Sequence, residues 1–301
     1  MKKLIPLIAM SLISYSAYAA DLPIQTVNNP SSPPKANWAG AYVGLNAGGV
    51  WSNNSSSAIS TFPLYASNAF SPNSILAAST AANSFSSGGY SGFIGGGQIG
   101  YNLAFDPGTS GLVVGFEADI QGVAGSSFSP SKPSIAPIAS TSASWISSAN
   151  MSTSLDYLGT ARGRLGIQIT PNVLIYGTGG LAYGGLSGRT NMSWIGTPQG
   201  SFSSGGGVFY GSGSTSNTTV GWTAGGGAEW MFASNWSAKV EYLYYNLGKL
   251  SYSSTAARLT NIGVASIYAS QTNTSIDGNL VRLGINYHFH TPSLAEIAKY
   301  Q

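Results

Sequence analysis

The chain has no cysteine, few charged residues and few histidines. None of its 301 residues is Cys, two are His, and 7% are Asp, Glu, Lys or Arg. Without Cys there is no disulfide framework, no thiolate metal site and no thiol nucleophile. The histidines, His288 and His290, stand at the end of one alternating segment with no carboxylate cluster beside them, so we predict a rim position, no metal site and no cofactor.

Long apolar runs are also missing. Lys2 and Lys3 precede a largely apolar run, and Ala17-Tyr18-Ala19 offers a small-residue cleavage site, so residues 1–19 are predicted to be a signal peptide. That run is too short for a membrane-spanning helix, and no later stretch approaches the roughly 20 apolar residues that such a helix needs. If the mature chain crosses a membrane, it crosses with strands.

Neither sign of charge is in large excess. Of the formal net charge of +3, two units come from Lys2 and Lys3, which the predicted cleavage removes. The remaining balance gives no support for a nucleic-acid partner. Pro30, Pro33 and Pro34 lie in the segment that follows the leader, and we interpret residues 20–37 as an extended periplasmic linker.

The sequence does contain a recurring two-residue alternation. Between Leu112 and Gln121, apolar side chains such as Phe116 take one face, while Glu117 and Asp119 take the other. Such alternation predicts a strand with one apolar and one polar face. In a soluble protein each apolar face needs a second layer to cover it, whereas in a membrane protein lipid covers it.

The alternation recurs in eight segments, about residues 41–51, 89–105, 112–121, 155–169, 173–185, 219–232, 236–246 and 279–289. Tight turns at 106–111, 170–172 and 233–235 alternate with long, Ser- and Asn-rich connections. Short periplasmic turns with long outer loops are typical of outer-membrane barrels, whose closure leaves no strand edge facing lipid. We therefore predict an all-β, eight-stranded antiparallel up-and-down transmembrane β-barrel over residues 38–289, with long extracellular loops.

Aromatic residues gather near the predicted strand ends, namely Trp51, Phe105, Phe232, Trp236, Tyr287 and Phe289. In a membrane barrel they form the girdles at the two interfaces. In a soluble sandwich they would fill the core instead, but a sandwich does not explain the regular exchange of short turns and long loops.

Most of the sparse charges share the inward parity, and we predict a lumenal charge network of Glu117, Asp119, Asp156, Arg162, Arg164, Glu229, Lys239, Glu241 and Arg282. Eight strands leave an interior only about wide enough for side chains, and buried charges are tolerated when they are paired. We favour a network that fills the lumen. The alternative is an ion pathway, or a gate made by exchange of ion-pair partners.

Two enzyme-like patterns do not fit this context. The glycines from Gly95 to Gly100 match G-x-G-x-x-G, but a dinucleotide site needs a strand, a turn and a helix, and these glycines lie within one alternating strand. On the predicted strands neither histidine neighbours an inward Ser and an acid, so no catalytic triad is assigned. We predict that the protein is not an enzyme.

The long connections, 52–87, 126–154, 187–217 and 251–275, carry apolar residues such as Phe62, Leu64 and Ile267. These residues either order the loops or extend the strands. Alternatively they contact partners, because surface loops on a rigid scaffold commonly carry binding function.

Three motifs carry a family resemblance: Trp38-Ala39-Gly40-Ala41-Tyr42-Val43-Gly44, Gly177-Thr178-Gly179-Gly180-Leu181-Ala182-Tyr183-Gly184 and Val281-Arg282-Leu283-Gly284-Ile285-Asn286-Tyr287-His288-Phe289. They resemble the small outer-membrane β-barrel proteins of alphaproteobacteria, which include surface antigens, porin-family proteins and haemin-binding members. The resemblance implies a cell outer membrane location, insertion by the barrel-assembly machinery, contact with outer-membrane lipid and lipopolysaccharide, and loops available to host or surface ligands.

One departure from that family concerns the C-terminal end. Such barrels usually end on a terminal aromatic residue, here Phe289, whereas this chain continues from His290 to Gln301 as a predicted periplasmic tail.

The expected function is an outer-membrane surface protein with a filled lumen, acting in envelope structure and surface interaction. The alternatives are a small porin-like diffusion channel and, by family analogy, a haemin or ligand receptor.

Overall fold

The computed structural model describes residues 37–53, 55–66, 84–105, 111–126, 131–137, 144–197, 208–260 and 263–289. All of them belong to one compact unit, Pro34–Gln301. The predicted signal peptide (1–19), all of the predicted linker (20–37) except Asn37, and the predicted tail (290–301) lie outside the described residues.

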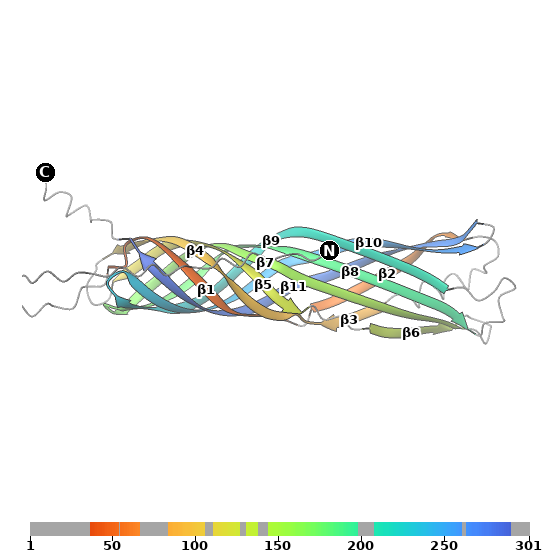
Figure 1. The fold of residues 1–301 in the computed structure, drawn as a ribbon, viewed down its shortest axis with the longest axis horizontal. Helices are drawn as coiled ribbons and strands as arrows, with labels where there is room; N and C mark the ends of the chain where they lie inside the picture. The colour runs from red at the N-terminus through yellow and green to blue at the C-terminus, as the bar shows by residue number, and fades with distance from the viewer. Residues whose placement is uncertain are drawn as a thin grey trace, which may run out of the picture. The chain divides into compact units, whose positions relative to one another are not determined.

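Eleven strands within these described ranges form one sheet (Figure 1). Their bounds are β1 Gly40–Ser52, β2 Ser55–Ala66, β3 Ser84–Gly88, β4 Ser91–Phe105, β5 Leu112–Ser126, β6 Ser131–Pro137, β7 Ser144–Thr170, β8 Val173–Thr197, β9 Val208–Ala233, β10 Trp236–Thr260 and β11 Gly263–His288. Eight of them close a ring in the order β1, β4, β5, β7, β8, β9, β10, β11 and back to β1. Every neighbouring pair in the ring is antiparallel, so the predicted fold class is confirmed.

Five of the ring strands are much longer than the sequence pattern predicts. β7 to β11 are 25 to 27 residues long. At a rise of about 3.3 Å per residue and a tilt of about 45°, each extends roughly 60 Å, more than twice the apolar band of an outer-membrane barrel. Large parts of the predicted loops are therefore strand, and Ile267 lies within β11.

Short strands take over where β1, β4 and β5 have ended. β11 pairs with β1 up to Gly278 and farther from the short turns pairs with β2 instead, from Thr274 to Ser266. β3 pairs with β2, and β6 pairs with β7. We call this region, formed by β2, β3, β6 and the far parts of β7 to β11, the outer extension.

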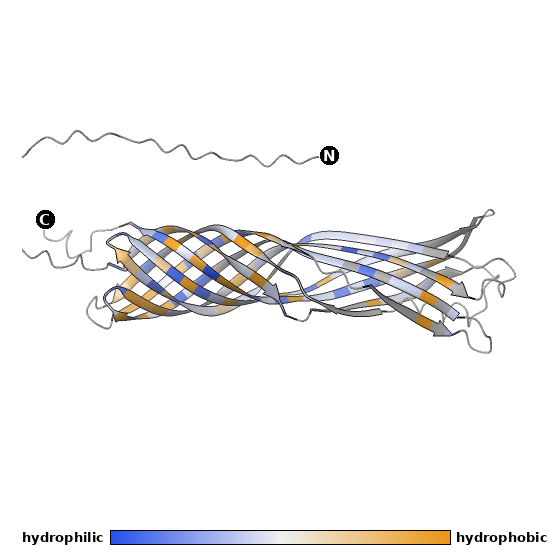
Figure 2. Ribbon diagram, turned by 60° about the horizontal axis from the view of Figure 1, so that its bottom comes forward, coloured by the Kyte–Doolittle hydropathy of each residue, from blue (hydrophilic) through white to orange (hydrophobic). Residues whose placement is uncertain are grey.

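The outer face of the ring is apolar. Leu45 is 73% exposed and Leu283 is 65% exposed. Many other large apolar side chains on this face are also exposed. Figure 2 shows orange positions recurring along the strands of the ring. A continuous apolar surface of this kind is expected only where lipid covers it. Within the described ranges the chain has no helix long and apolar enough to cross a membrane.

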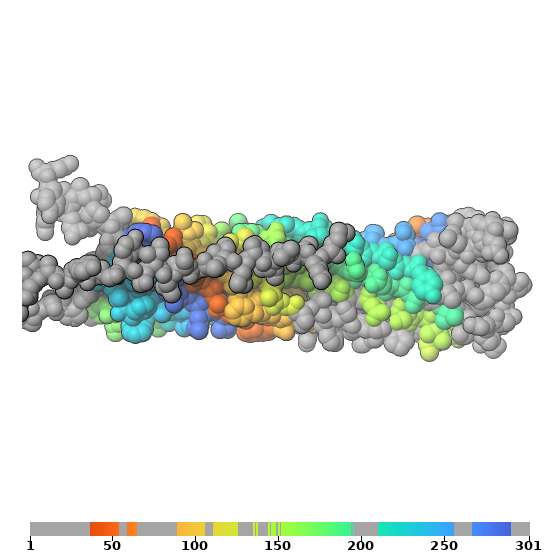
Figure 3. Space-filling model, in the orientation of Figure 1, coloured from red at the N-terminus to blue at the C-terminus, as the bar shows by residue number. Residues whose placement is uncertain are grey.

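Aromatic side chains mark two levels on this outer face. Trp230, Phe232 and Trp236 lie near the short turns, and Tyr183 and Trp222 lie farther along the strands. The outward positions of β8 between Val173 and Tyr183 cover roughly 23 Å along the membrane normal, close to the apolar band of known barrels. The ring therefore has the height that a bilayer requires. On the face seen in Figure 3, side chains of neighbouring strands pack against one another.

Candidate functional site

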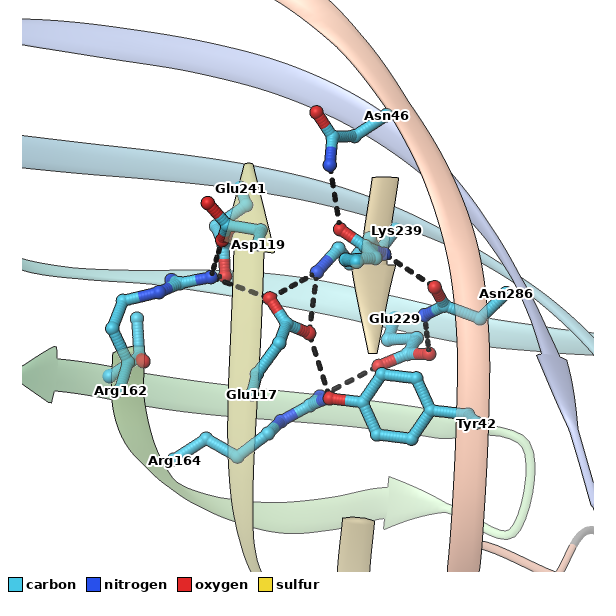
Figure 4. A network of polar contacts seen from close by, with 12 residues as sticks. Tyr42, Asn46, Glu117, Asp119, Arg162, Arg164, Glu229, Lys239, Glu241 and Asn286 are labelled. Carbon is cyan, nitrogen blue, oxygen red and sulfur yellow. Dashed lines mark hydrogen bonds and ion pairs between the residues drawn. The ribbon is translucent and has the colours of Figure 1, made fainter. Parts of the chain in front are cut away.

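Charged side chains from five strands meet inside the ring (Figure 4). Because alternate residues of a strand share one face, a spacing of two places Glu117 and Asp119, Arg162 and Arg164, and Lys239 and Glu241 all inward. The strand pairing sets Glu117 opposite Arg162, Lys239 opposite Glu229, and Glu241 opposite Arg282. Each of these eight residues is at most 4% exposed.

Glu117 lies at the centre of the network. Its carboxylate accepts hydrogen bonds from Arg162 Nη2 at 2.5 Å and from Lys239 Nζ at 2.8 Å to each oxygen. Arg282 Nη2 lies at 3.3 Å and Arg164 Nη1 at 3.8 Å. One carboxylate thus has four cationic neighbours, and ionised partners make these the stronger kind of hydrogen bond.

Two arginines bridge the remaining acids on the side of the network nearer the outer extension. Arg162 donates to Asp119 at 2.9 Å and to Glu241 at 3.0 Å. Arg282 donates to Asp119 at 2.8 Å through Nη2 and to Glu241 at 2.8 Å through Nε. The planar guanidinium suits such paired contacts, and each carboxylate is neutralised by more than one donor.

Glu229 anchors the side of the network nearer the short turns. It accepts from Arg164 Nη2 at 2.6 Å, from Asn286 Nδ2 at 2.7 Å and from the Ser237 hydroxyl at 2.5 Å. The Arg164 guanidinium also lies 4.0 Å from the centre of the Tyr176 ring, a cation–π arrangement.

His288 is a functional-site residue that the sequence interpretation missed. It is 1% exposed rather than at a rim. Its Nε2 lies 2.9 Å from Ser237 Oγ and 3.4 Å from a Glu229 oxygen, so an inward Ser and an acid do neighbour this histidine. The signal was available, because His288 shares the inward parity of Arg282 and Asn286 on the same strand.

The structure corrects the prediction for Asp156. Its side chain is exposed, and the hydroxyls of Ser187 and Ser154 donate to it at 2.7 and 3.3 Å. A bulge between Leu155 and Tyr157 adds one residue to β7 relative to β8. Because one extra residue exchanges the two faces of a strand, Leu155 points into the lumen instead.

Apolar side chains close the lumen on both sides of the network. The inner seal, near the short turns, consists of Trp38, Val113, Leu174, Tyr176 and Met231. The outer seal consists of Val50, Tyr90, Ile94, Leu155, Leu158, Ala182, Leu186, Leu243, Tyr245, Leu247, Leu250, Tyr252, Ile276 and Leu280. Along β10 the inward positions pass from Lys239 and Glu241 directly to Leu243, which shows the boundary between the network and the outer seal.

Trp38 forms the floor of the inner seal. It is 1% exposed, and its indole Nε1 donates to the carbonyl oxygen of Pro171 in the turn between β7 and β8 at 2.9 Å. Its ring also meets the ring of His288 edge-on at 6.0 Å. Trp38, two residues before the start of β1, therefore closes the lumen beneath the charged layer.

The glycines of the G-x-G-x-x-G match serve packing. Gly95 to Gly100 lie within β4 and no helix follows them, so the context of a dinucleotide site is absent from this described segment. A Cβ atom on Gly100 would come within 2.3 Å of the Tyr42 ring. Among the described residues there is no group of three or more His, Asp or Glu side chains that would hold a metal ion.

Comparison with known proteins agrees with this architecture. The model of the outer membrane protein beta-barrel domain family matches residues 5–289. The 31 kDa outer-membrane immunogenic proteins of Brucella melitensis biotype 1 and Brucella suis biovar 1 are each 30% identical over 298 residues, covering 96% of this chain and all of theirs.

Among solved structures, OprG from Pseudomonas aeruginosa is 12% identical, with a TM-score of 0.37 over 85% of this chain and 99% of its own. Ail of Yersinia pestis is 11% identical, with a TM-score of 0.25 over 81% of this chain and 99% of its own. The family match covers nearly the whole chain, including every strand of the ring. The chain therefore belongs to the outer membrane protein beta-barrel domain family and is a protein of the outer membrane.

Proposed function

We propose that the protein is a closed outer-membrane barrel that acts in envelope structure and surface interaction, and not as a pore. The observation that carries the proposal is the lumen itself, in which balanced, mutually paired charges lie between two apolar seals. A conducting path would need a continuous column of water through all three layers.

Opening such a path has a high free-energy cost. Separation of one buried ion pair leaves an uncompensated charge, at a cost of about 3–5 kcal/mol. Here Arg162 bridges three carboxylates, those of Glu117, Asp119 and Glu241, so its displacement disturbs several pairs at once. The two apolar seals would also have to rearrange.

Planar-bilayer recording on the refolded mature chain tests this proposal. We expect no stable open state in the wild-type protein. The Trp38→Ala variant removes the floor of the inner seal and leaves the charges in place. It therefore separates the contribution of the inner seal to closure of the lumen from the contribution of the charge network. A stable, ion-selective conductance from the wild-type chain would refute the closed-barrel proposal.

The outer extension is the part that we propose contacts surface partners. Its strands continue roughly 30 Å beyond the lipid-facing band. Phe62 and Leu64 on β2 and Tyr210 on β9 are exposed there, although most of the outward residues around them are polar. The Brucella relatives are named as immunogenic proteins, which supports exposure of this region at the cell surface. Antibodies raised against the extension should bind intact cells; binding only after permeabilisation would contradict the proposal.

A gated diffusion channel is the second candidate. Lys239 and Arg282 both contact the Glu117 carboxylate, so exchange between alternative pairs has a structural basis. If this candidate is correct, Lys239→Gln should change the conductance or its voltage dependence. A change in stability alone, without current, would favour the closed barrel.

We propose no catalytic and no haemin-binding role. Ser237, His288 and Glu229 lie close together, but each is at most 1% exposed and no substrate reaches them without disruption of the inner seal. We infer that this trio anchors the network. Haem titration of the refolded protein should give no spectral shift, and a saturable shift would support the receptor alternative.

A further inference from the structure

A polar hollow lies on the outer surface of the outer extension, across β7, β8 and β9. It has a volume of about 430 Å³ and is lined by Ser152, Ser154, Ser187, Gly188, Arg189, Ser214, Thr215 and Ser216. The lining is almost entirely hydroxyl groups around a single cationic side chain. Such a combination suits an anionic group carried on a sugar, because hydroxyls and a guanidinium donate hydrogen bonds to both.

The strand register places Arg189 at the middle of the hollow. Ser152 on β7 and Ser214 on β9 lie directly opposite Arg189 on β8. The next row consists of Ser154, Ser187 and Ser216. Because the flanking side chains are small, the guanidinium is open to solvent on both sides, and Arg189 is exposed.

Arg189 has no protein partner within the described ranges. Neither an ion pair nor a hydrogen bond engages its guanidinium there. Two serines of the hollow, Ser154 and Ser187, donate hydrogen bonds to the carboxylate of Asp156. The Asp156 carboxylate would repel a bare anion that Arg189 attracts. The site therefore favours an anionic group attached to a hydroxyl-rich ligand, which also binds the serines.

The height of the hollow above the lipid-facing band identifies the ligand class. Tyr183 ends the lipid-facing part of β8, and Arg189 lies roughly 14 Å beyond it along the membrane normal. A phospholipid headgroup layer is only about 5–8 Å thick on each side of a bilayer. Among the lipids of the outer leaflet, only one with an extended sugar headgroup reaches Arg189.

We propose that this hollow binds a phosphate or carboxylate on the core sugars of lipopolysaccharide. The lipid would stand against the ring with its acyl chains on the apolar wall and its core sugars over the serine rows. The inference goes beyond the proposed function and does not depend on whether the lumen conducts.

The test compares two single variants of the refolded full mature chain. Arg189→Gln removes the cation from the hollow, and Lys249→Gln removes an exposed cation of β10 that does not line it. We expect Arg189→Gln to weaken binding of purified lipopolysaccharide by roughly 1.5- to fivefold, the range of an exposed charged contact. Lys249→Gln should leave the binding of lipopolysaccharide unchanged. Neither variant should change the binding of phosphatidylglycerol vesicles.

A second variant separates shape from charge. Ser214→Leu keeps Arg189 but fills the hollow beside it, and it should weaken lipopolysaccharide binding to a similar degree. Retained barrel mobility on unheated gels shows that each variant has folded. Equal losses from Arg189→Gln and Lys249→Gln, or no loss from Arg189→Gln, would overturn the proposal. The proposal would also be overturned if a soluble sulfated polysaccharide bound more tightly than lipopolysaccharide and Arg189→Gln weakened both ligands equally.

Discussion

At the scale of single residues, stability depends on whether a charge is buried among partners or stands in solvent. Glu117 is 2% exposed and faces four cations, whereas Asp156 is exposed and accepts hydrogen bonds from two serine hydroxyls. Removal of a partner from a buried network leaves the opposite charge uncompensated, while exposed substitutions usually change stability little. The same chemical change should therefore have very different effects at the two positions.

We predict that Glu117→Gln lowers the free energy of unfolding by about 3–5 kcal/mol. Asp156→Asn should change it by no more than about 0.5 kcal/mol. Urea unfolding in lipid vesicles, followed by tryptophan fluorescence, measures both. Equal effects from the two variants would contradict the assignment of Glu117 as the centre of the network.

Titration of a phenol distinguishes the interior of the outer extension from solvent. Burial raises the pKa of Tyr268 on β11 to about 12. Because the folded-state pKa lies above the ordinary value near 10, this phenol contributes stability below pH 10 that is lost as the pH rises toward 12. Tyr268→Phe should remove one late-titrating phenolate absorbance and reduce the alkaline loss of stability. Loss of a phenolate that titrates near the ordinary value of about 10 instead would show that the extension is open to water.

At the scale of strands, the sequence pattern predicts the wall of the ring well and the outer extension poorly. In β5 the lipid-facing Phe116 and the lumenal Glu117 differ so sharply that period two alone assigns the faces. In the extension of β8 the outward Ser187 and the inward Thr190 are both hydroxyl residues, so there is little alternation to detect. The bulge at Asp156 depends on the register with β8, and one strand's sequence does not reveal it.

Neighbouring glycines of β4 provide a prediction at this scale. A Cβ atom on Gly96 would come within 2.0 Å of the Ile120 carbonyl oxygen on β5, whereas one on Gly97 finds its nearest neighbour at 3.8 Å. Backbone atoms do not yield as a flexible side chain does, so Gly96→Ala should destabilise the barrel by about 1–3 kcal/mol. Gly97→Ala should be close to neutral in the same unfolding measurement. If Gly97→Ala is the more harmful, the predicted strand contact is wrong.

At the scale of the ring and its outer extension, the polar and apolar faces of a single strand change sides. The apolar face is outward in the ring and inward in the outer extension. β10 has Val240 outward and Glu241 inward in the ring, but farther along Ser251 is outward and Leu250 inward. The first order suits lipid outside and the second suits water outside. The change marks the outer boundary of the membrane without reference to any other protein.

This boundary predicts a difference in chemical reactivity between two exposed positions. The chain has no native Cys, so a single introduced thiol is the only one present. Ser214 is exposed on the outer extension, and Leu283 is 65% exposed on the wall of the ring. In intact cells a membrane-impermeant maleimide should label Ser214→Cys and leave Leu283→Cys unlabelled, because lipid covers the second position; both should react after unfolding in denaturant. Rapid labelling of Leu283→Cys in intact cells would place water against the apolar wall and refute the membrane assignment of this band.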